Sequence, residues 1–405
     1  HSYIRYGIGG KRMNILGDAL PRRFKAKASG AITAGKPCII EADGAVAAVF
    51  TDSASEAIGS EAVFANAYTI RISGVHDENA NKVVIVYKND SNYGTAIVGT
   101  VDASNNSISF GTAVVFESGD TNWTSCAYDS TAQKVVIAFG DGSFHGNAIV
   151  GTVSGTSISF GSSTKFESAY TSYLSANYDT NAGKIVISYQ DTDNSGYGTA
   201  IVGTVSGTSI SFGSAVVFES ASANYVSSAY DSAAQKHVIA YRDSGNSNYG
   251  TAIVGTVSGT SISFGTAVVF ESASTLDCAV SYDDNAEKTV IAYRDGGNSN
   301  YGTAIVATVS GTSISYGTAA VFESAYSHEI KSAFDKNAQK VVITYSDAGN
   351  SNYGTVIAGT VSNTSISFGS AAVFNSAQVS HLGTFYDSTN KKVIIPYRDH
   401  GNSNY

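Results

Sequence analysis

A tandem repeat of about 52 residues constrains this chain more than any other feature of its sequence. The tyrosine that opens the segment YGTAIVGTV stands at Tyr197 and Tyr249, and the same spacing continues through Tyr301, Tyr353 and Tyr405. Because repeats of this kind stack small, similar units rather than fold around one large core, the unit itself must specify the architecture.

Each unit predicts four β-strands and no helix. In the unit around residue 240, strands are predicted at 225–231, 236–243, 249–257 and 261–272, and short polar turns separate them. The second and third strands are apolar on both faces, so the sheet must pack between other sheets. Four-stranded sheets packed face to face at this period are typical of β-propeller blades.

Two marker residues predict the number of blades. The Asp that ends the first strand occurs at Asp77, Asp129, Asp179, Asp231, Asp283, Asp335 and Asp387. The Phe of the fourth strand occurs at Phe64, Phe116, Phe166, Phe218, Phe270, Phe322 and Phe374. Both series contain seven members, so we expect an all-β, seven-bladed propeller of four-stranded blades.

The order of the markers predicts how the ring closes. The first Phe precedes the first Asp, and no Phe follows the last Asp. We therefore expect residues 37–66 to complete the last blade beside residues 380–399, with Ala45–Val49 pairing with a strand of the C-terminal repeat. Closure of this kind removes exposed sheet edges. In the alternative, the native chain continues beyond Tyr405 with another third strand.

Charge divides the chain into an arm and a body. The chain has a net charge of −9, but residues 1–27 carry seven basic groups against Asp18, which leaves −15 on the rest. An acidic body argues against binding to nucleic acid or to an anionic membrane, and no apolar run reaches the roughly 18 residues of a membrane span. We expect residues 1–36 to be a basic attachment arm and residues 37–405 to be the propeller. The arm is alternatively a solvated, flexible terminus.

No catalytic, metal or cofactor site is predicted. The seven His fall at unrelated positions of the repeat, and the recurring Asp sits at a turn where it can accept backbone hydrogen bonds. The loop Asp243–Asn248 has too few carboxylates for calcium. Three scattered Cys indicate buried small side chains rather than disulfides. Arg242-Asp243, Arg294-Asp295 and Arg398-Asp399 invite comparison with sialidases, but we carry no sialidase residue over to this chain.

The segment that joins the fourth strand of one unit to the first strand of the next is the most variable part of the repeat, and we predict it to be an exposed loop that binds ligand. It supplies the candidate ligand-binding residues Trp123, Tyr170, Tyr173, Tyr225, Tyr326, His328 and His381. Aromatic side chains with an N–H or O–H group suit sugar stacking and interfaces. Alternatively, these side chains pack between blades.

The block GTAIVGTVSGTSISFGTAVVFES and the segment ASGAITAGKPCIIEADGAVAAV (28–49) resemble repeat-rich β-propeller structural proteins of marine bacteriophages, of the tail-fibre or capsid-associated type. The resemblance implies an extracellular, non-catalytic virion component that contacts other virion or filament subunits through its N-terminal arm. Its further partner would be a glycan or protein of the host surface. The alternative function is a carbohydrate-active propeller, either a lectin or a sialidase-like protein.

Overall fold

A computed structural model describes residues 38–40, 46–48 and 57–402 of the chain. The chain divides into two compact units that meet between Ala57 and Ile58, later than the division predicted after residue 36. In the first unit, β1 (Cys38–Ile40) pairs antiparallel with β2 (Val46–Ala48). The predicted attachment arm, residues 1–36, lies outside the described residues.

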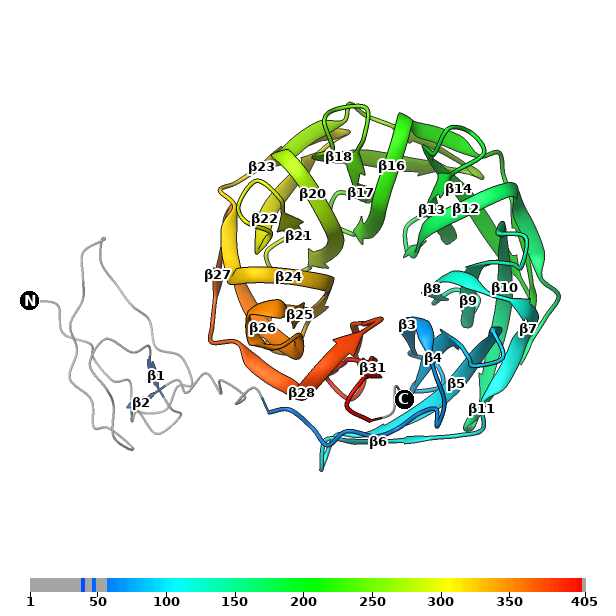
Figure 1. The fold of residues 1–405 in the computed structure, drawn as a ribbon, viewed down its shortest axis with the longest axis horizontal. Helices are drawn as coiled ribbons and strands as arrows, with labels where there is room; N and C mark the ends of the chain where they lie inside the picture. Colours follow the sequence, from blue (N-terminus) through cyan, green and yellow to red (C-terminus); the bar gives the residue numbers. More distant parts are fainter. Residues whose placement is uncertain (1–37, 41–45, 49–56, 403–405) are drawn as a thin grey trace, which may run out of the picture. The chain divides into compact units, whose positions relative to one another are not determined.

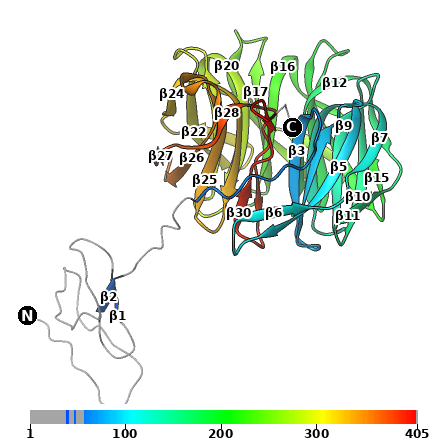
Figure 2. The same cartoon turned by 60° about the horizontal axis from the view of Figure 1, so that its bottom comes forward.

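The second unit repeats one antiparallel sheet around a central axis (Figure 1). A representative sheet pairs the second half of β16 (Val216–Asp231) with β17 (Lys236–Asp243) and then with β18 (Tyr249–Ser258). The outer side of β18 pairs with β19 (Ser261–Phe264) and with the first half of β20 (Val268–Asp283). Figure 2 shows the sheets from the side of the ring.

The strands of the other sheets repeat this pattern. The strands equivalent to β17 are β4 (Lys82–Lys88), β9 (Lys134–Gly140), β13 (Lys184–Asp191), β21 (Lys288–Asp295) and β25 (Lys340–Asp347). Those equivalent to β18 are β5 (Tyr93–Asp102), β10 (His145–Ser154), β14 (Tyr197–Ser206), β22 (Tyr301–Ser310) and β26 (Tyr353–Ser362). Those equivalent to β19 are β6 (Ser107–Phe110), β11 (Ser157–Phe160), β15 (Ser209–Phe212), β23 (Ser313–Tyr316) and β27 (Ser365–Phe368).

The remaining strands are the first and fourth strands of the units. The first strands β3 (Ile70–Asp77) and β8 (Asn122–Asp129) lie at the inner side of the ring, and β7 (Val114–Asp120) is a fourth strand that pairs with β5. The long strands β12 (Thr164–Asp179), β16, β20 and β24 (Ala320–Asp335), together with β28 (Ala372–Ser380), lead from the outer side of one sheet to the inner side of the next. The last sheet continues with β29 (Phe385–Asp387), β30 (Lys392–Ile394) and β31 (Arg398–Asp399). In the sheet before it, a 3₁₀ turn, η1 (Ala348–Asn350), follows β25. β12, β16, β20 and β24 each belong to two sheets, so the fourth strand of one unit runs without a break into the first strand of the next. The predicted variable loop is therefore part of a strand.

The recurring Asp serves the turn between the first two strands, as predicted. Asp231 Oδ1 accepts a hydrogen bond from the backbone N–H of Ala234 at 2.8 Å, and Asp283 Oδ1 accepts one from Ala286 at the same distance. The side-chain bond organises the tight turn that leads into the second strand.

The second strand forms the core between neighbouring sheets. Val238, Ile239 and Tyr241 are fully buried, as expected for a strand that is apolar on both faces. The fourth-strand Phe of one sheet packs on the second-strand Tyr of the next, as Phe218 does on Tyr241 with 5.3 Å between ring centroids. The Tyr hydroxyl donates to a Glu of the same fourth strand in four places: Tyr189–Glu167, Tyr241–Glu219, Tyr293–Glu271 and Tyr345–Glu323.

The last sheet departs from the repeat. β28 pairs with β31 and β29 pairs with β30, but no described residue supplies a third strand. The predicted pairing of Ala45–Val49 with the C-terminal repeat is wrong, because the described part of that segment, β2, pairs with β1. The reason is local: two short strands five residues apart can satisfy their hydrogen bonds as a hairpin.

Residues 59–66 do lie against the last sheet, as the match of GSEAVFAN to GTAVVFES predicts. Glu61 accepts a hydrogen bond from the Tyr397 hydroxyl at 2.6 Å. Phe64 packs on Tyr87 with 5.3 Å between ring centroids, which is the contact that each fourth-strand Phe makes with the next sheet. The first and last sheets also touch directly, because His76 Nε2 lies 3.1 Å from Asp387 Oδ1.

Candidate binding site

In six units one residue bulges out of the first strand at the inner side of the ring, and in the last unit the equivalent residue, His381, directly follows β28. In β16 the pairing with β17 shifts register between Asn224 and Ser227, and Tyr225 between them has a φ of 52°. The equivalent residues of all seven units have a positive φ: Arg71, Trp123, Tyr173, Tyr225, Asp277, Glu329 and His381. A positive φ is uncommon for bulky residues, and bulges of this kind re-aim a side chain, often beside a functional site.

The bulge position is chemically diverse. The third strand is nearly constant from unit to unit, whereas the seven bulge residues supply one guanidinium, three aromatic rings, two carboxylates and one imidazole. Each of the seven side chains is partly exposed. The innermost strands contact one another around the axis, and the contacts include one between β3 and β29.

An aromatic arc occupies one part of this ring. The Arg71 guanidinium carbon lies 4.0 Å from the centroid of the Trp123 ring. The Trp123 and Tyr173 centroids are 4.6 Å apart, and those of Tyr173 and Tyr225 are 5.2 Å apart. Arg242 lies 5.1 Å from the Tyr225 centroid and ends the series. Three rings of neighbouring sheets and two cations thus form one continuous surface.

A charged arc completes the ring. Asp277 Oδ2 lies 3.2 Å from Arg294 Nη2, and burial raises the pKa of Asp277 although Arg294 opposes this change. Burial lowers the pKa of His381 to about 4; Glu329 acts in the opposite direction, and Arg71 adds to the lowering. Burial also lowers the pKa of Arg71, while Glu329 raises it. Side chains from different sheets therefore share one electrostatic environment.

Four of the predicted ligand-binding residues occupy bulge positions: Trp123, Tyr173, Tyr225 and His381. The other three make different contacts. Tyr170 stacks on Phe144 with 4.3 Å between centroids. Tyr326 lies against Arg294, whose guanidinium donates to its hydroxyl. His328 Nε2 is 2.9 Å from Asn352 Oδ1.

Sequence reasoning missed three members of the ring, Arg71, Asp277 and Glu329. Their signal was the register of the repeat, which aligns each of them with Tyr225 at steps of 50 or 52 residues. The candidates predicted from the sequence were aromatic and His residues only, so residues of other types at the same position of the repeat were not among them. The alternative in which the aromatic side chains pack between blades holds in part, because Trp123, Tyr173 and Tyr225 contact one another across sheets while remaining partly exposed.

Other predicted features have local structural explanations. Cys126 and Cys278 are buried free thiols, and burial raises the pKa of each to about 12. Arg242 and Arg398 lie over the rings of Tyr225 and Tyr68. Within the described ranges, no group of three or more His, Cys, Asp or Glu is placed to hold a metal ion. The same part of the chain contains no helix that is long and apolar enough to span a membrane.

Comparisons with known proteins relate the chain through its fold. No protein-family model matches it, and no curated protein matches its sequence. It is similar to the BP39L lectin from Burkholderia pseudomallei, with 9% identity and a TM-score of 0.60 over 83% of this chain and 94% of that one. It also matches a mutant of the Aleuria aurantia lectin AAL in complex with Fucalpha1-6GlcNAc, with 12% identity and a TM-score of 0.47 over 76% of this chain and 96% of that one. At 9% identity, the first similarity shows that the chain shares the overall fold of that lectin.

Proposed function

We propose that this chain is a non-catalytic carbohydrate-binding protein whose ligand contacts the ring of seven bulge residues. The observation that carries the proposal is the aromatic arc of Arg71, Trp123, Tyr173 and Tyr225, which is partly exposed and held by strained backbone. Aromatic faces bind the apolar face of a sugar ring, and the N–H and O–H groups at their edges can bond its hydroxyls. The lectin of similar fold supports this class of ligand.

We further propose that the repeated sheets are the blades of a seven-bladed propeller. Seven innermost strands, one per marker Asp, support this count. The contact of His76 with Asp387 supports closure, because the equivalent residues of the interior units, such as Tyr128 and Asp77, also interact across neighbouring sheets. In this proposal the ring closes through contacts between the first and last sheets and through residues 59–66, and β2 takes no part in the closure.

Binding without catalysis fits the carboxylates of the ring better than hydrolysis does. Glycosidases use one carboxyl group as an acid and a second, free carboxylate opposite it, whereas Asp277 is ion-paired with Arg294. The three Arg that invite comparison with sialidases lie against tyrosine rings or an Asp of this chain. Turnover of a glycosidase or sialidase substrate that Asp277→Asn or Glu329→Gln abolishes would overturn this part of the proposal.

A glycan array tests the binding function. The wild-type protein should bind at least one class of glycan, and Trp123→Ala should weaken that binding at least tenfold while leaving the unfolding midpoint within a few degrees. The matched control is Tyr93→Ala, which removes an exposed tyrosine at the start of β5 that is not one of the bulge residues. No binding to neutral or acidic glycans, or equal binding by the wild type and Trp123→Ala, would refute the proposal.

The attachment of residues 1–36 to virion or filament subunits, and an extracellular location, remain proposals from the sequence alone. Deletion of residues 1–36 should leave glycan binding unchanged and remove incorporation into a particle or filament. Normal assembly of the truncated chain would show that the arm is a terminal extension without that role.

A further inference from the structure

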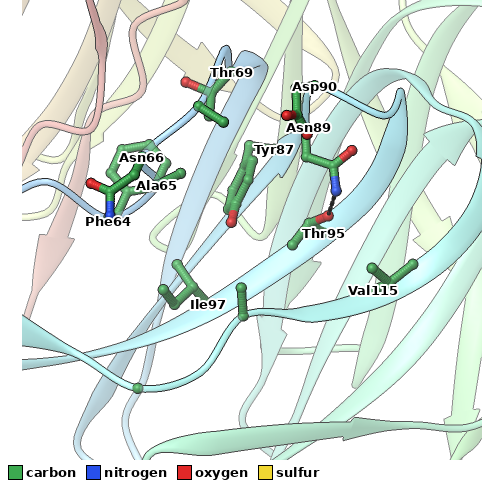
Figure 3. A pocket seen from close by; sticks show the side chains of 13 residues that line it. Phe64, Ala65, Asn66, Thr69, Tyr87, Asn89, Asp90, Thr95, Ile97 and Val115 are labelled. Carbon is green, nitrogen blue, oxygen red and sulfur yellow. Dashed lines mark hydrogen bonds between the residues drawn. The ribbon is translucent and has the colours of Figure 1, made fainter. Parts of the chain in front are cut away.

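A second candidate site lies on the first sheet, where residues 64–69 meet β4 and β5 (Figure 3). A pocket of about 420 Å³ is lined there by Phe64, Ala65, Thr69, Tyr87, Asn89 and neighbouring residues. In Figure 3, Tyr87 stands between the segment with Phe64 and Ala65 and the strand with Thr95. No contact with the bulge residues contributes to this pocket, so the argument for it is independent of the proposed function.

The pocket exists because one repeat position has lost its carboxylate. In four units the second-strand Tyr hydroxyl donates to a fourth-strand Glu, as Tyr293 does to Glu271 at 3.1 Å, and the Tyr397 hydroxyl donates to Glu61 instead. The residue in register with Glu271 beside Tyr87 is Ala65. Tyr87 therefore keeps the position of its counterparts, but no described residue accepts a hydrogen bond from its hydroxyl. Burial raises the pKa of Tyr87 to about 12, so this hydroxyl remains a donor at neutral pH.

A second carboxylate is also missing at the same place. Six units have an Asp at the end of the second strand, as in Asp243 and Asp295, and the first unit alone has Asn89 there. The charge of Asp295 acts on Tyr293 together with that of Glu271. Around Tyr87, a methyl group and a neutral amide thus replace two negative charges, which reduces the repulsion that an anion would meet beside Tyr293.

Thr69 adds an unpartnered polar group to the pocket. It is fully buried, and its hydroxyl has no hydrogen-bond partner. Its counterparts are satisfied: the Thr275 hydroxyl donates to the Ala273 carbonyl oxygen, and the Ser327 hydroxyl donates to that of Ala325. An unsatisfied buried hydroxyl costs about 1–3 kcal/mol, so this unit carries a cost at the wall of the pocket that its counterparts avoid.

We propose that this pocket binds a small molecule through a carboxylate group, which takes the place of the missing Glu beside Tyr87. The Tyr87 hydroxyl donates to the carboxylate, while Thr69 lies near the opposite end of the Tyr87 side chain (Figure 3). Phe64, Ile97 and Val115 contact the apolar body of the ligand. The acidic side chain among the lining residues is Asp90, which is exposed at the edge and limits affinity through screened repulsion.

Propionate is the appropriate probe, because it reproduces the end of a Glu side chain, and propanamide is its neutral isostere. In saturation-transfer and titration NMR with the full chain, propionate should bind at millimolar concentration, at least fivefold more tightly than propanamide. Ala65→Glu, which supplies the missing carboxylate from the protein, should weaken propionate binding at least tenfold. Asp90→Asn should strengthen it about twofold.

The repeat offers a matched gain-of-site control. Glu271→Ala removes the carboxylate from an intact unit and should create a second propionate site beside Tyr293, although Asp295 would make that site weaker. Glu323→Ala provides the same test beside Tyr345 if the first variant does not fold. Equal binding of propionate and propanamide, or unchanged propionate binding in Ala65→Glu, would overturn the proposal. Neither result would bear on glycan binding by the bulge ring.

Discussion

His381 should make the stability of this protein fall in mildly acidic solution. Burial lowers its pKa in the folded state to about 4 from an ordinary value of 6.5. The unfolded chain therefore binds a proton more readily than the folded one, and the contribution of His381 is complete above pH 6.5 and lost as the pH falls towards 4. Since a tenfold change in proton affinity corresponds to about 1.4 kcal/mol, the full loss is at most about 3 kcal/mol, and about 2 kcal/mol of it should occur between pH 7.5 and pH 5.

Denaturant unfolding of the wild type and of His381→Gln at these two pH values measures the contribution of His381 to the free energy of unfolding. Carboxyl groups such as Glu271, whose pKa burial raises, change stability in the opposite direction, and they do so equally in both proteins. The difference between the unfolding free energies of the two proteins should therefore change by about 2 kcal/mol between pH 7.5 and pH 5. A difference that is the same at both pH values would refute the argument that His381 is held neutral at the centre of the ring.

Three further predictions concern the repeat itself. Tyr293→Phe should lower the free energy of unfolding by about 1–2 kcal/mol, because Glu271 loses its hydroxyl donor; an unchanged denaturation midpoint would contradict this. Gly213→Ala should destabilise the fold by about 2 kcal/mol or more, because the added carbon would lie 1.8 Å from a carbonyl oxygen of the next sheet; a variant as stable as the wild type in thermal unfolding would disprove it. Cys126 and Cys278 should resist thiol alkylation until the chain unfolds, because both are buried and their pKa is raised; rapid labelling of either peptide in native buffer, as seen by mass spectrometry, would exclude this placement.

The repeated sheet could be predicted from local patterns in the sequence. Turn residues such as Asp231 and apolar strands such as 236–243 act within a few residues of chain, so their pattern reports the local structure directly. The register of the repeat also identified Phe64 as a fourth-strand residue, and its contact with Tyr87 follows the same rule as that of Phe218 with Tyr241.

Which side chains meet depends on the tertiary structure. Trp123 and Tyr173 are 50 residues apart in sequence, and they touch because two innermost strands converge on the axis and both bulge at the same point. Ala65 lacks a carboxylate, and it lines a pocket because the fold places it beside Tyr87 of the next sheet. Residues 46–48 carry a strand pattern that is compatible with two different pairings, and hydrogen bonding to residues 38–40 selected one of them. Contacts between distant segments depend on the geometry of the ring, which a local pattern does not contain.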